Sequence, residues 1–466
     1  MTDATRYTFR AKKVLLFGLG LLGGGVATAN WLIKQGAKLT ITDLKTEKEL
    51  VASLKKLKGK YALALGKHTL KDVKAADLVV LNPGVPASHP LLKKAKRVVN
   101  EATIFYDAFP GPIIGITGTR GKSTTAAWTA HLIGTGAILA GNSPEHPFLS
   151  ALPLKLKGES VGVCEMSSFA LELFEDFKRK PDIAVITNIY QDHFNRYESY
   201  RDYVAAKANI FTHQKANQHV IFNYDNSWTP HLLTLPHSSS DWFFSVSELP
   251  AELSGLVAKQ GRVYLQRSGR QSEVLDLKGF VTAWGAHNVE NFMAAALAAH
   301  LSGTSWREVQ KRIATLPQIP FRQEVIFENK KITVVNDSNA TSPEAVIAAA
   351  KRFASPATIL ITGGTDKKLV FTKWAPLVLQ YLAPENIVML SGTATSKMLR
   401  ALGAHAKAVT VCDTLAECLV EALQKAKAYH HATLVFSPGA ASFEKFANEY
   451  DRGRQFSALV KTLLKK

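Results

Sequence analysis

The part of this sequence with the clearest chemical meaning is the run of residues 117–124, which reads Thr-Gly-Thr-Arg-Gly-Lys-Ser-Thr. An apolar segment, residues 112–116, precedes it, and a helix-like segment, residues 126–130, follows it. A strand, a glycine-rich turn ending in Gly-Lys-Ser and a helix start together form a phosphate cradle. In such a cradle backbone N–H groups and the lysine contact the phosphates, and the serine hydroxyl reaches Mg²⁺. The run therefore predicts a nucleoside triphosphate site.

One residue departs from the strict P-loop spacing, because Ile116 stands where the common form has a glycine. The match is therefore to a shortened variant of the motif. An ordinary loop that happens to contain Gly-Lys-Ser is the alternative interpretation, but the strand-like segment before the turn and the helix-like segment after it favour the phosphate site.

Length and composition predict a protein of several globular domains. The chain has 466 residues, of which 46% are hydrophobic and 20% charged, which suffices for two to four domains with their own cores. The formal net charge is +19, but the lysines are scattered and form no basic arm or stripe. We therefore interpret the excess charge as solvated surface that also attracts polyanionic small substrates, and we expect no nucleic-acid partner.

The cysteines and the N-terminal region both indicate a cytoplasmic protein. Cys164, Cys412 and Cys418 are too few and too irregularly spaced for a disulfide framework or a zinc site, which fits a reducing compartment. The uncharged stretch 14–33 resembles a signal peptide, but its glycines make a poor apolar helix and it continues into a second predicted strand. We expect no membrane insertion.

The first hundred residues predict a parallel sheet with crossover helices, because short β-branched runs alternate with helical stretches at residues 14–17, 38–42, 78–81 and 97–100. The glycine-rich turn 18–23 follows the first run and Asp43 closes the second, which formally satisfies the dinucleotide fingerprint. Any nucleotide diphosphate suits such a turn. From these residues alone NAD(P) and another nucleotide remain equally open, and a tight turn that binds nothing is a less favoured third interpretation.

Two further blocks repeat the alternation of strands and helices. In the middle block, Glu165 follows the run 161–163 and Asn188 follows the run 183–187, so both should lie at the ligand-binding edge of a sheet, beside the phosphate cradle. The last block has strand-like runs at residues 331–335, 358–361, 387–390, 409–411 and 433–436. The sequence thus predicts the α/β class, with domains over residues 1–105, 106–317 and 318–466.

Five motifs in order resemble the Mur ligase family, over essentially the whole chain. They are residues 117–124, residues 165–169, Asn188 with Asp192-His193 and Arg196-Tyr197, His287-Asn288 with Asn291, and residues 336–338 with Ala340-Thr341. The resemblance implies a Rossmann-like UDP-binding domain, a central P-loop ATPase-type domain and a C-terminal Rossmann-like domain. Within the family the chain is similar to the ligases that add D-glutamate to UDP-N-acetylmuramoyl-L-alanine in cytoplasmic peptidoglycan precursor synthesis.

The chemistry that the resemblance implies is amide-bond formation. ATP phosphorylates the substrate carboxylate, the amine of the amino acid attacks the acyl phosphate, and phosphate leaves. Such a reaction needs positioning and charge neutralisation more than a nucleophilic side chain. The implied ligands are ATP, Mg²⁺ as two ions, UDP-N-acetylmuramoyl-L-alanine and D-glutamate, and we expect the protein to act as a monomer.

The same resemblance implies roles for individual residues. The catalytic residues are Lys122, Glu165, His193 and Lys207, and the metal ligands are Ser123, Glu165, His193 and Lys207. The ATP contacts are Gly118, Thr119, Arg120, Gly121, Lys122, Ser123, Thr124, Asn288, Asn291, Arg322 and Asp337. The contacts to the UDP-linked substrate are Gly18, Gly20, Leu21, Leu22, Asp43, Leu44, Asn82, Pro83, Gly84, Asn142 and Ser167. The amino-acid contacts are Thr341, Lys367, Ser442 and Phe443.

Lys207 resembles a lysine that carries a carbamate in this family. Independently, Val204, Lys207 and Phe211 share one face of the predicted helix, and that face is apolar. A buried lysine loses its charge easily, and a neutral amine can react with carbon dioxide. The alternative is an ordinary lysine whose ammonium reaches solvent.

Four departures from the family pattern leave the ligase chemistry intact but bear on the choice of amino acid, for which D-glutamate remains the leading choice. Arg120 stands in place of an asparagine, Asn339 in place of a lysine, residues 141–144 replace Gly-Asn-Ile-Gly, and Glu449-Tyr450 stand where an aromatic is expected. Another amino-acid ligase of the superfamily, such as one like folylpolyglutamate synthase, is therefore the first alternative. An NAD(P)-dependent oxidoreductase and a basic nucleic-acid-binding ATPase are the alternatives from other classes.

Overall fold

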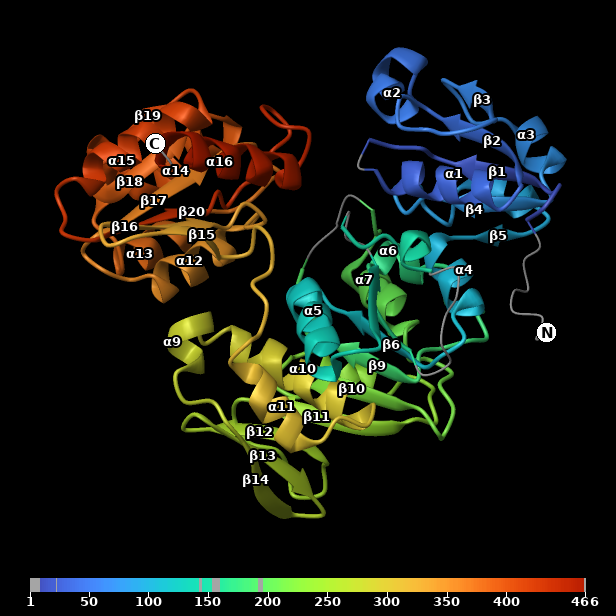
Figure 1. The fold of residues 1–466 in the computed structure, drawn as a ribbon, viewed down its shortest axis with the longest axis horizontal. Helices are drawn as coiled ribbons and strands as arrows, with labels where there is room; N and C mark the ends of the chain where they lie inside the picture. Colours follow the sequence, from blue (N-terminus) through green and yellow to red (C-terminus); the bar gives the residue numbers. More distant parts are fainter. Residues whose placement is uncertain (1–8, 22, 142–144, 153–159, 192–195, 465–466) are drawn as a thin grey trace. The chain divides into compact units, whose positions relative to one another are not determined.

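The computed structural model describes residues 9–21, 23–141, 145–152, 160–191 and 196–464 (Figure 1). The chain divides into two compact units, which are described separately. The first comprises Met1–Lys278 and Asn288–Pro317, and the second comprises Gly279–His287 and Gln318–Lys466. The second unit is thus assembled from two separate stretches of the chain.

The N-terminal part of the first unit contains a parallel sheet with the strand order β3-β2-β1-β4-β5 in the described residues. Its strands are β1 (Lys13–Phe17), β2 (Lys38–Asp43), β3 (Ala62–Leu65), β4 (Leu78–Leu81) and β5 (Val98–Val99). Its helices are α1 (Gly24–Lys34), α2 (Glu47–Leu54), α3 (Leu70–Ala75), η1 (Pro90–Lys94) and α4 (Glu101–Ala108). The strand order reverses beside β1, and open α/β sheets bind ligands at such a switch point.

The two faces of this sheet carry separate cores. Leu16 and Val80 pack with α1 and α2 on one face, whereas Leu15 and Val79 pack with α3 and η1 on the other. Strand β4 reads Leu-Val-Val-Leu and is buried throughout, as expected for a parallel strand covered on both sides.

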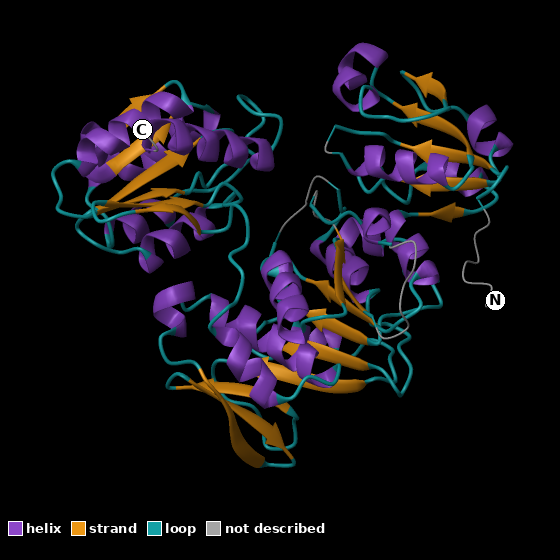
Figure 2. Ribbon diagram, in the orientation of Figure 1, coloured by secondary structure: helices purple, strands orange, loops and turns teal. Residues whose placement is uncertain are grey.

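The rest of the first unit is built on a larger sheet with the order β14-β13-β12-β11-β10-β9-β6-β8-β7 in the described residues (Figure 2). Its strands are β6 (Ile113–Thr117), β7 (Ala137–Gly141), β8 (Val161–Glu165), β9 (Ile183–Ile186), β10 (His219–Asn223), β11 (Ser240–Ser245), β12 (Gly255–Lys259), β13 (Arg262–Arg267) and β14 (Arg270–Asp276). Strands β6 to β12 pair in parallel, and β13 and β14 add antiparallel hairpins.

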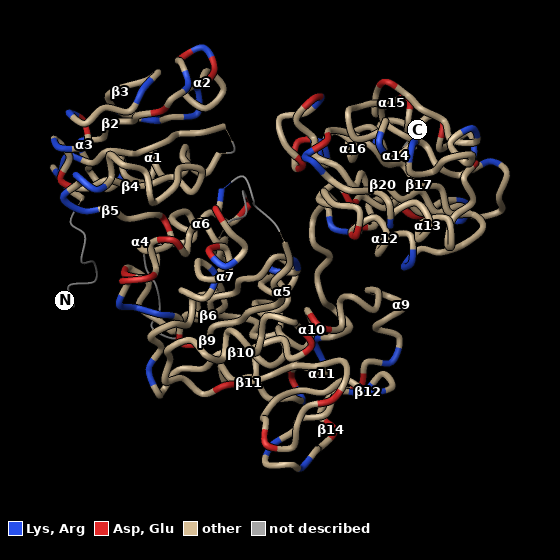
Figure 3. Tube along the Cα trace, turned by 180° about the vertical axis from the view of Figure 1, so that it is seen from behind, with Lys and Arg blue, Asp and Glu red and all other residues tan. Residues whose placement is uncertain are grey.

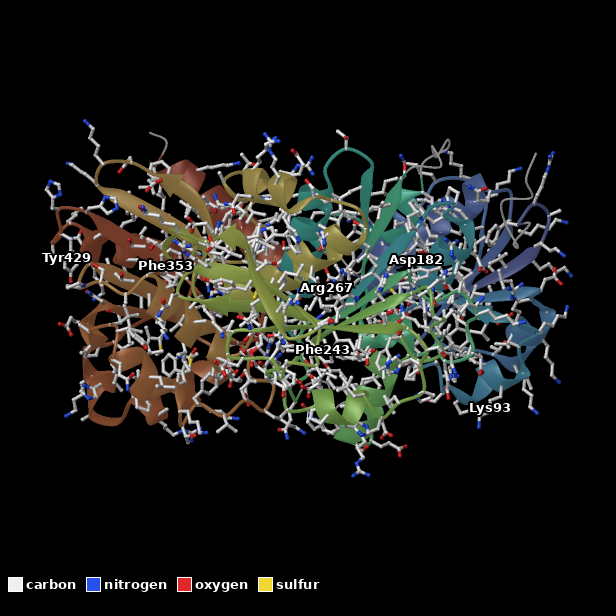
Figure 4. The ribbon with its side chains drawn as sticks, turned by 90° about the horizontal axis from the view of Figure 1, so that it is seen from below. Lys93, Asp182, Phe243, Arg267, Phe353 and Tyr429 are labelled. Atoms are coloured by element: carbon white, nitrogen blue, oxygen red, sulfur yellow. The ribbon has the colours of Figure 1, made fainter. Side chains whose placement is uncertain are left out.

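Helices cover both faces of this sheet. They are α5 (Lys122–Ile133), η2 (Phe148–Ala151), α6 (Ser168–Leu171), α7 (Tyr200–Ala208), α8 (Thr229–Leu232), α10 (Asn288–Leu301) and α11 (Trp306–Ile313). Trp128 of α5 meets Phe292 of α10 edge to face. Phe243 of β11, which Figure 4 labels, belongs to the core that α7 shares. At the start of β6, the Ile113 N–H donates to the Asp182 carboxylate at 2.8 Å, which fixes the strand end remote from the phosphate cradle.

The second unit contains a sheet with the order β15-β16-β20-β17-β18-β19, again among the described residues. Its strands are β15 (Glu324–Glu328), β16 (Ile332–Asn336), β17 (Thr358–Gly363), β18 (Ile387–Leu390), β19 (Thr410–Cys412) and β20 (Ala432–Phe436). Its helices are α9 (Phe280–Trp284), α12 (Pro343–Arg352), α13 (Trp374–Leu379), η3 (Pro384–Asn386), α14 (Thr393–Leu402), η4 (Gly403–Ala408), α15 (Leu415–Ala426) and α16 (Glu449–Leu464). All the pairings are parallel except that of β15 with β16.

Two helix layers enclose this sheet: α12, α13 and α14 pack on one face, and α15 and α16 on the other. The three sheets together confirm the predicted α/β class. In the described segments, no helix has the length and apolar character needed to span a bilayer. Lys and Arg are interspersed with Asp and Glu along the chain (Figure 3).

Candidate active site

The predicted phosphate cradle has the expected strand, turn and helix. Strand β6 ends at Thr117, the turn begins at Gly118, and α5 starts at Lys122 with Gly121 as its N-cap. Both glycines have positive φ, 154° at Gly118 and 80° at Gly121. A Cβ on Gly118 would lie 1.9 Å from Thr187 Oγ1, and a Cβ on Gly121 would lie 2.0 Å from Asn291 Oδ1. The turn therefore accepts only glycine at these two positions, which leaves room for backbone close to a ligand.

The loop after β9 is hydrogen-bonded to the turn. The Thr119 N–H donates to the Asn188 carbonyl at 2.9 Å, and the Arg120 N–H donates to Asn188 Oδ1 at 2.8 Å. The Thr187 hydroxyl donates to the Arg120 carbonyl at 2.6 Å. These bonds fix the backbone conformation of the turn, and with it the direction of the N–H groups at the start of α5.

Two lysines meet at the turn. Lys122 Nζ donates to the carbonyls of Gly118 and Thr119 at 3.0 and 3.1 Å. Lys207, which is 2% exposed, donates from Nζ to the same Gly118 carbonyl at 2.8 Å and lies 4.7 Å from the ring centroid of Tyr203. The Tyr203 hydroxyl is in turn 2.9 Å from Thr119 Oγ1. The prediction that Lys207 is buried is therefore confirmed, and its amine contacts the backbone of the cradle.

Oxygen ligands suitable for Mg²⁺ lie on the same edge of the sheet. Glu165 is the last residue of β8, is buried, and pairs in register with Ile116 of β6, one residue before the strand end. Ser123 lies in the first turn of α5. Mg²⁺ prefers few protein oxygens and keeps several waters, so this donor set fits the ion. His193 lies outside the described residues, and within those that are described no group of three His, Cys, Asp or Glu side chains forms a metal cluster.

The first turn of α10 forms another wall of the cradle. Asn291 donates from Nδ2 to Asn288 Oδ1 at 2.9 Å, and its side chain fills the space beside Gly121. Next to it, Glu290 accepts a hydrogen bond from Asn223 at 3.1 Å. Burial raises the pKa of Glu290, although the bond from Asn223 lowers it in part. Asn288 and Asn291 thus lie where contacts to a nucleotide on the cradle are possible.

The N-terminal glycine-rich turn is held by Asp43. Its Oδ2 accepts from the Leu19 and Gly20 N–H groups at 2.8 and 3.0 Å, and its Oδ1 accepts from the Lys45 N–H at 2.9 Å. Burial raises the pKa of Asp43, but these three backbone donors outweigh it and the pKa is lowered. The carboxylate therefore shapes the turn.

The other predicted contacts to a UDP-linked substrate surround this turn. A Cβ on Gly18 would lie 3.1 Å from Asn82 Cβ, so the loop with Asn82, Pro83 and Gly84 is seated against it. Leu21 and Leu44 are exposed beside the turn. Ser167 instead caps α6, accepting from the Ala170 N–H at 3.1 Å. Leu22 and Asn142 lie outside the described residues.

The predicted amino-acid contacts gather within the second unit, at the carboxyl ends of β16, β17 and β20. Thr365 and Ala441 bond each other through both N–H and carbonyl groups at 3.0 Å, which joins the Lys367 loop to the loop of Ser442 and Phe443. The Gly439 N–H donates to the Ala340 carbonyl at 2.9 Å, which brings the Thr341 loop to the same place. Ser442 is buried, whereas Phe443 is 67% exposed.

Arg452 connects these loops, and the sequence did not reveal it. It is fully buried in α16 and donates to the carbonyls of Ser338, Ala440 and Ala441 at 2.6, 3.0 and 3.1 Å, respectively, and to Ser338 Oγ at 3.1 Å. Burial lowers its pKa to about 10, opposed by Glu449 and Asp337.

Asp337 lies inside the second unit, with both oxygens occupied. Oδ1 accepts from the Gln323 N–H at 3.0 Å and Oδ2 from the Ser437 hydroxyl at 2.7 Å. Burial raises its pKa to about 7, against the effect of these bonds and of the Arg322 and Arg352 charges. Of the predicted ATP contacts, Arg322 and Asp337 thus belong to the second unit and the others to the first.

Comparison with known proteins identifies the family. The model of the Mur ligase middle domain matches residues 116–299, and that of the Mur ligase MurD-like N-terminal domain matches residues 12–103. A UDP-N-acetylmuramoylalanine--D-glutamate ligase from a Roseiflexus species is 34% identical, over 97% of this chain and 98% of its own length. The chain belongs to the Mur ligase family. A ligase of the same name from Koribacter versatilis is 32% identical, over 97% and 98% of the two chains.

Solved Mur ligases share the fold at lower identity. MurF from Acinetobacter baumannii has a TM-score of 0.60 at 15% identity and covers 100% of this chain and 93% of its own. The MurF ligase from Thermotoga maritima in complex with ADP has a TM-score of 0.56 at 15% identity, covering 100% and 99%. These similarities confirm the predicted Mur ligase architecture of N-terminal Rossmann-like, central ATP-binding and C-terminal parts.

Sequence reasoning on this Mur ligase found the cradle but missed the groups that support it. Thr187, directly after β9, and Tyr203 of α7 bond the turn itself, whereas Asn223 of β10 bonds the Thr187 carbonyl and Glu290 of α10. Their only sequence signal is a polar residue near the end of a buried strand or at the start of a helix. That signal is too common to select them without the fold.

Proposed function

We propose that this Mur ligase uses ATP to join D-glutamate to UDP-N-acetylmuramoyl-L-alanine, releasing ADP and phosphate, in peptidoglycan precursor synthesis. The observation that carries the proposal is the 34% identity, over 97% of the chain, to a ligase named for this reaction. The glycine-rich turn with Lys122 supports the ATP-dependent half of the reaction, because it presents N–H groups and a cation at the start of α5.

The chain's own residues hold the triphosphate in this proposal. The N–H groups of the turn and Lys122 bind the β- and γ-phosphates, and the fixed geometry from Asn188 keeps them aligned without reorganisation during the reaction. Mg²⁺, as two ions, supplies neutralisation of phosphate charge, with Ser123 and Glu165 as the described ligands. We assign His193 as a further ligand.

Lys207 takes a supporting role at the metal. Its amine is buried and lies 2.8 Å from the Gly118 carbonyl. A neutral buried amine adds to the carbon of carbon dioxide and releases one proton to solvent, and the resulting carbamate places a carboxylate beside the cradle. We propose that Lys207 carries this group, which adds an oxygen donor to those of Ser123 and Glu165.

The two remaining substrates bind at the edges of the other two sheets. The UDP-linked carboxylate substrate binds at the glycine-rich turn of Gly18 and Gly20 with Leu21, Leu44 and the loop after β4. D-Glutamate binds in the second unit, at the loops of Thr341, Lys367 and Ser442-Phe443. We place the reaction in the cytoplasm, with small-molecule substrates and the monomer as the working form.

A direct assay tests the proposal. The purified protein with ATP, Mg²⁺ and UDP-N-acetylmuramoyl-L-alanine is expected to release ADP when D-glutamate is added, and the UDP-linked product should gain the mass of one glutamate residue. L-Glutamate, other amino acids, and folate with L-glutamate are tested in parallel. Turnover with one of these and none with D-glutamate would reject the proposed substrate, whereas no ADP with any acceptor would reject the ligase function itself.

A further inference from the structure

One buried ion pair, between Glu172 at the C-terminal end of α6 and Arg196 in the segment between β9 and α7, contacts the loop after β4. Arg196 and Glu172 are 9% and 14% exposed in their side chains, and Arg196 Nη2 lies 2.8 Å from Glu172 Oε2. A second bond runs from Arg196 Nε to Glu172 Oε1 at 2.9 Å. The guanidinium therefore engages the carboxylate with both arms of its fork, which is the strong and geometrically specific form of this contact.

The remaining donors of the same guanidinium bind the loop after β4. Arg196 Nη1 donates to the Pro83 carbonyl at 3.1 Å, and Nη2 donates to the Val85 carbonyl at 3.1 Å. Glu172 binds that loop as well, because its Oε2 accepts from the Ala87 N–H at 3.0 Å. The ion pair thus binds residues 83–87 at three backbone groups, which are spaced so that one planar fork and one carboxylate satisfy them together.

Aromatic side chains hold the ion pair in place. The Arg196 guanidinium lies 4.5 Å from the ring centroid of Phe169, and the Tyr197 hydroxyl donates to Glu172 Oε1 at 3.1 Å. Both groups keep water away from the charges, which strengthens their attraction. A surface ion pair is flexible and weak, but these contacts give this one a single geometry.

The residues 83–87 lie against the glycine-rich turn. A Cβ on Gly18 would be 3.2 Å from Val85 Cγ2 and 3.1 Å from Asn82 Cβ, so no side chain separates the loop from the turn. Any shift of Val85 would therefore change the surface on which we place the UDP-linked substrate.

Through Glu172, the ion pair is also connected to the phosphate cradle. Glu172 is the C-cap of α6, and α6 is reached from Glu165 at the end of β8 through Met166 and Ser167. The Met166 carbonyl accepts from the Thr117 hydroxyl at 2.9 Å, on the strand that enters the cradle. The cradle is thus connected to the loop after β4 by covalent and hydrogen-bonded groups, and that loop packs directly on the glycine-rich turn.

We infer that Arg196 and Glu172 are positioning residues for the UDP-linked substrate. The ion pair holds residues 83–87 on the glycine-rich turn and connects that turn to the cradle; this role rests on the proposed function. Phosphoryl transfer from ATP to the substrate carboxylate, with ADP as the leaving group, requires that carboxylate within reach of the γ-phosphate, and small misplacements are costly for such a reaction. Arg196 and Glu172 contact neither ATP nor the UDP-linked substrate and act through residues 83–87.

The test separates binding of the two nucleotides. Arg196→Lys keeps the charge but removes the fork, so it cannot satisfy Glu172, Pro83 and Val85 together. It is expected to raise the KM for UDP-N-acetylmuramoyl-L-alanine on the order of tenfold, to leave the KM for ATP unchanged, and to weaken UDP binding in calorimetry by a similar factor. Glu172→Gln, which preserves size, should shift the same constants in the same direction by a smaller factor.

A matched control is available on the same unit. Arg262 and Glu273 form an exposed pair between β13 and β14, with Arg262 Nη1 2.6 Å from Glu273 Oε2, and Arg262→Lys should change neither KM. A purely structural role for Arg196 would lower thermal stability and leave the UDP constants unchanged, and that result would overturn the inference. Equal rises in the KM for ATP and for the UDP-linked substrate would also overturn it.

Failure of the proposed function is recognised separately. If the wild-type protein forms no glutamyl product, UDP calorimetry on wild type, Arg196→Lys and Glu172→Gln still decides whether the ion pair supports the turn. Unchanged UDP affinity in both folded variants would refute the positioning role, and reduced affinity in both would support it whatever the amine acceptor is. If Arg196→Lys does not fold, as judged by circular dichroism, Glu172→Gln carries the test.

Discussion

Replacing Gly121 by alanine tests the cradle most sharply, because the chain contains a matched glycine. Gly121 is the N-cap of α5 with φ 80° and ψ −10°, and Gly279 is the N-cap of α9 with φ 77° and ψ −8°. An alanine in this left-handed conformation costs roughly 1–2 kcal/mol. At Gly279 a Cβ meets nothing within 4 Å, whereas at Gly121 it would lie 2.0 Å from Asn291 Oδ1.

The two variants therefore share the backbone strain and differ in the displacement of Asn291. That side chain would lose its 2.9 Å bond to Asn288, which is worth about 1 kcal/mol. We expect Gly279→Ala to lower the free energy of unfolding by roughly 1–2 kcal/mol and Gly121→Ala by roughly 2–3 kcal/mol. Since about 1.4 kcal/mol is a factor of ten, loss of one nucleotide hydrogen bond through Asn291 predicts a rise in the KM for ATP of roughly tenfold.

The assay is ADP release at varied ATP, with urea unfolding of each variant beside it. Gly121→Ala should show the raised KM for ATP and Gly279→Ala the wild-type value. The reasoning is refuted if both variants keep the wild-type KM, because the space beside Gly121 would then be irrelevant to the nucleotide. It is also refuted if both raise the KM equally, because strain alone would then account for the effect.

Three other substitutions probe the site. Lys122→Ala should abolish ADP release while circular dichroism stays unchanged, because a cation at the phosphates is lost; residual activity near wild type would contradict its role. Lys207→Ala should be inactive and partly restored by short carboxylates such as acetate, and a failure of that rescue would indicate an ordinary structural lysine. Asp337 has a pKa raised to about 7 by burial, from 3.8. Its protonated form is therefore favoured by folding, so its contribution to stability is full below the unfolded pKa of 3.8, falls as pH rises towards about 7, and is constant above that. The free energy of unfolding of wild type relative to Asp337→Asn, measured in urea at pH 5 and pH 8, should be lower at pH 8; no change would contradict the assigned burial.

Local patterns predicted the parts of the fold that depend on local physics. The strand runs at residues 14–17, 78–81, 183–187 and 387–390 correspond to β1, β4, β9 and β18, because buried parallel strands are continuous apolar segments. The helical spacing around Lys207 likewise predicted its burial. In contrast, the sequence did not reveal β3, which is short and lacks β-branched residues, or the hairpin strands β13 and β14, whose apolar residues are interrupted by charged and polar ones.

The supporting residues of the site could not be predicted, because they depend on pairing over long distances in the chain. Arg452 is an arginine in an amphipathic helix, for which an exposed position is the ordinary expectation, yet its guanidinium is buried among three carbonyls. Arg196 was part of a recognised motif, but its partner Glu172 and its target Pro83 follow only from the assembled fold. Charged residues acquire such roles through tertiary contacts, which single-sequence patterns do not encode.

The two-segment construction of the second unit limits how this protein can be recombined with its relatives. The polypeptide passes between the units after Lys278, His287 and Pro317. Arg352 in α12 donates to the Ala283 carbonyl, and its charge, after burial, lowers the pKa of His287 to about 4. A hybrid gene fused only at residue 318 would pair Arg352 with a foreign 279–287 segment, so a functional exchange of the C-terminal portion must carry both pieces together.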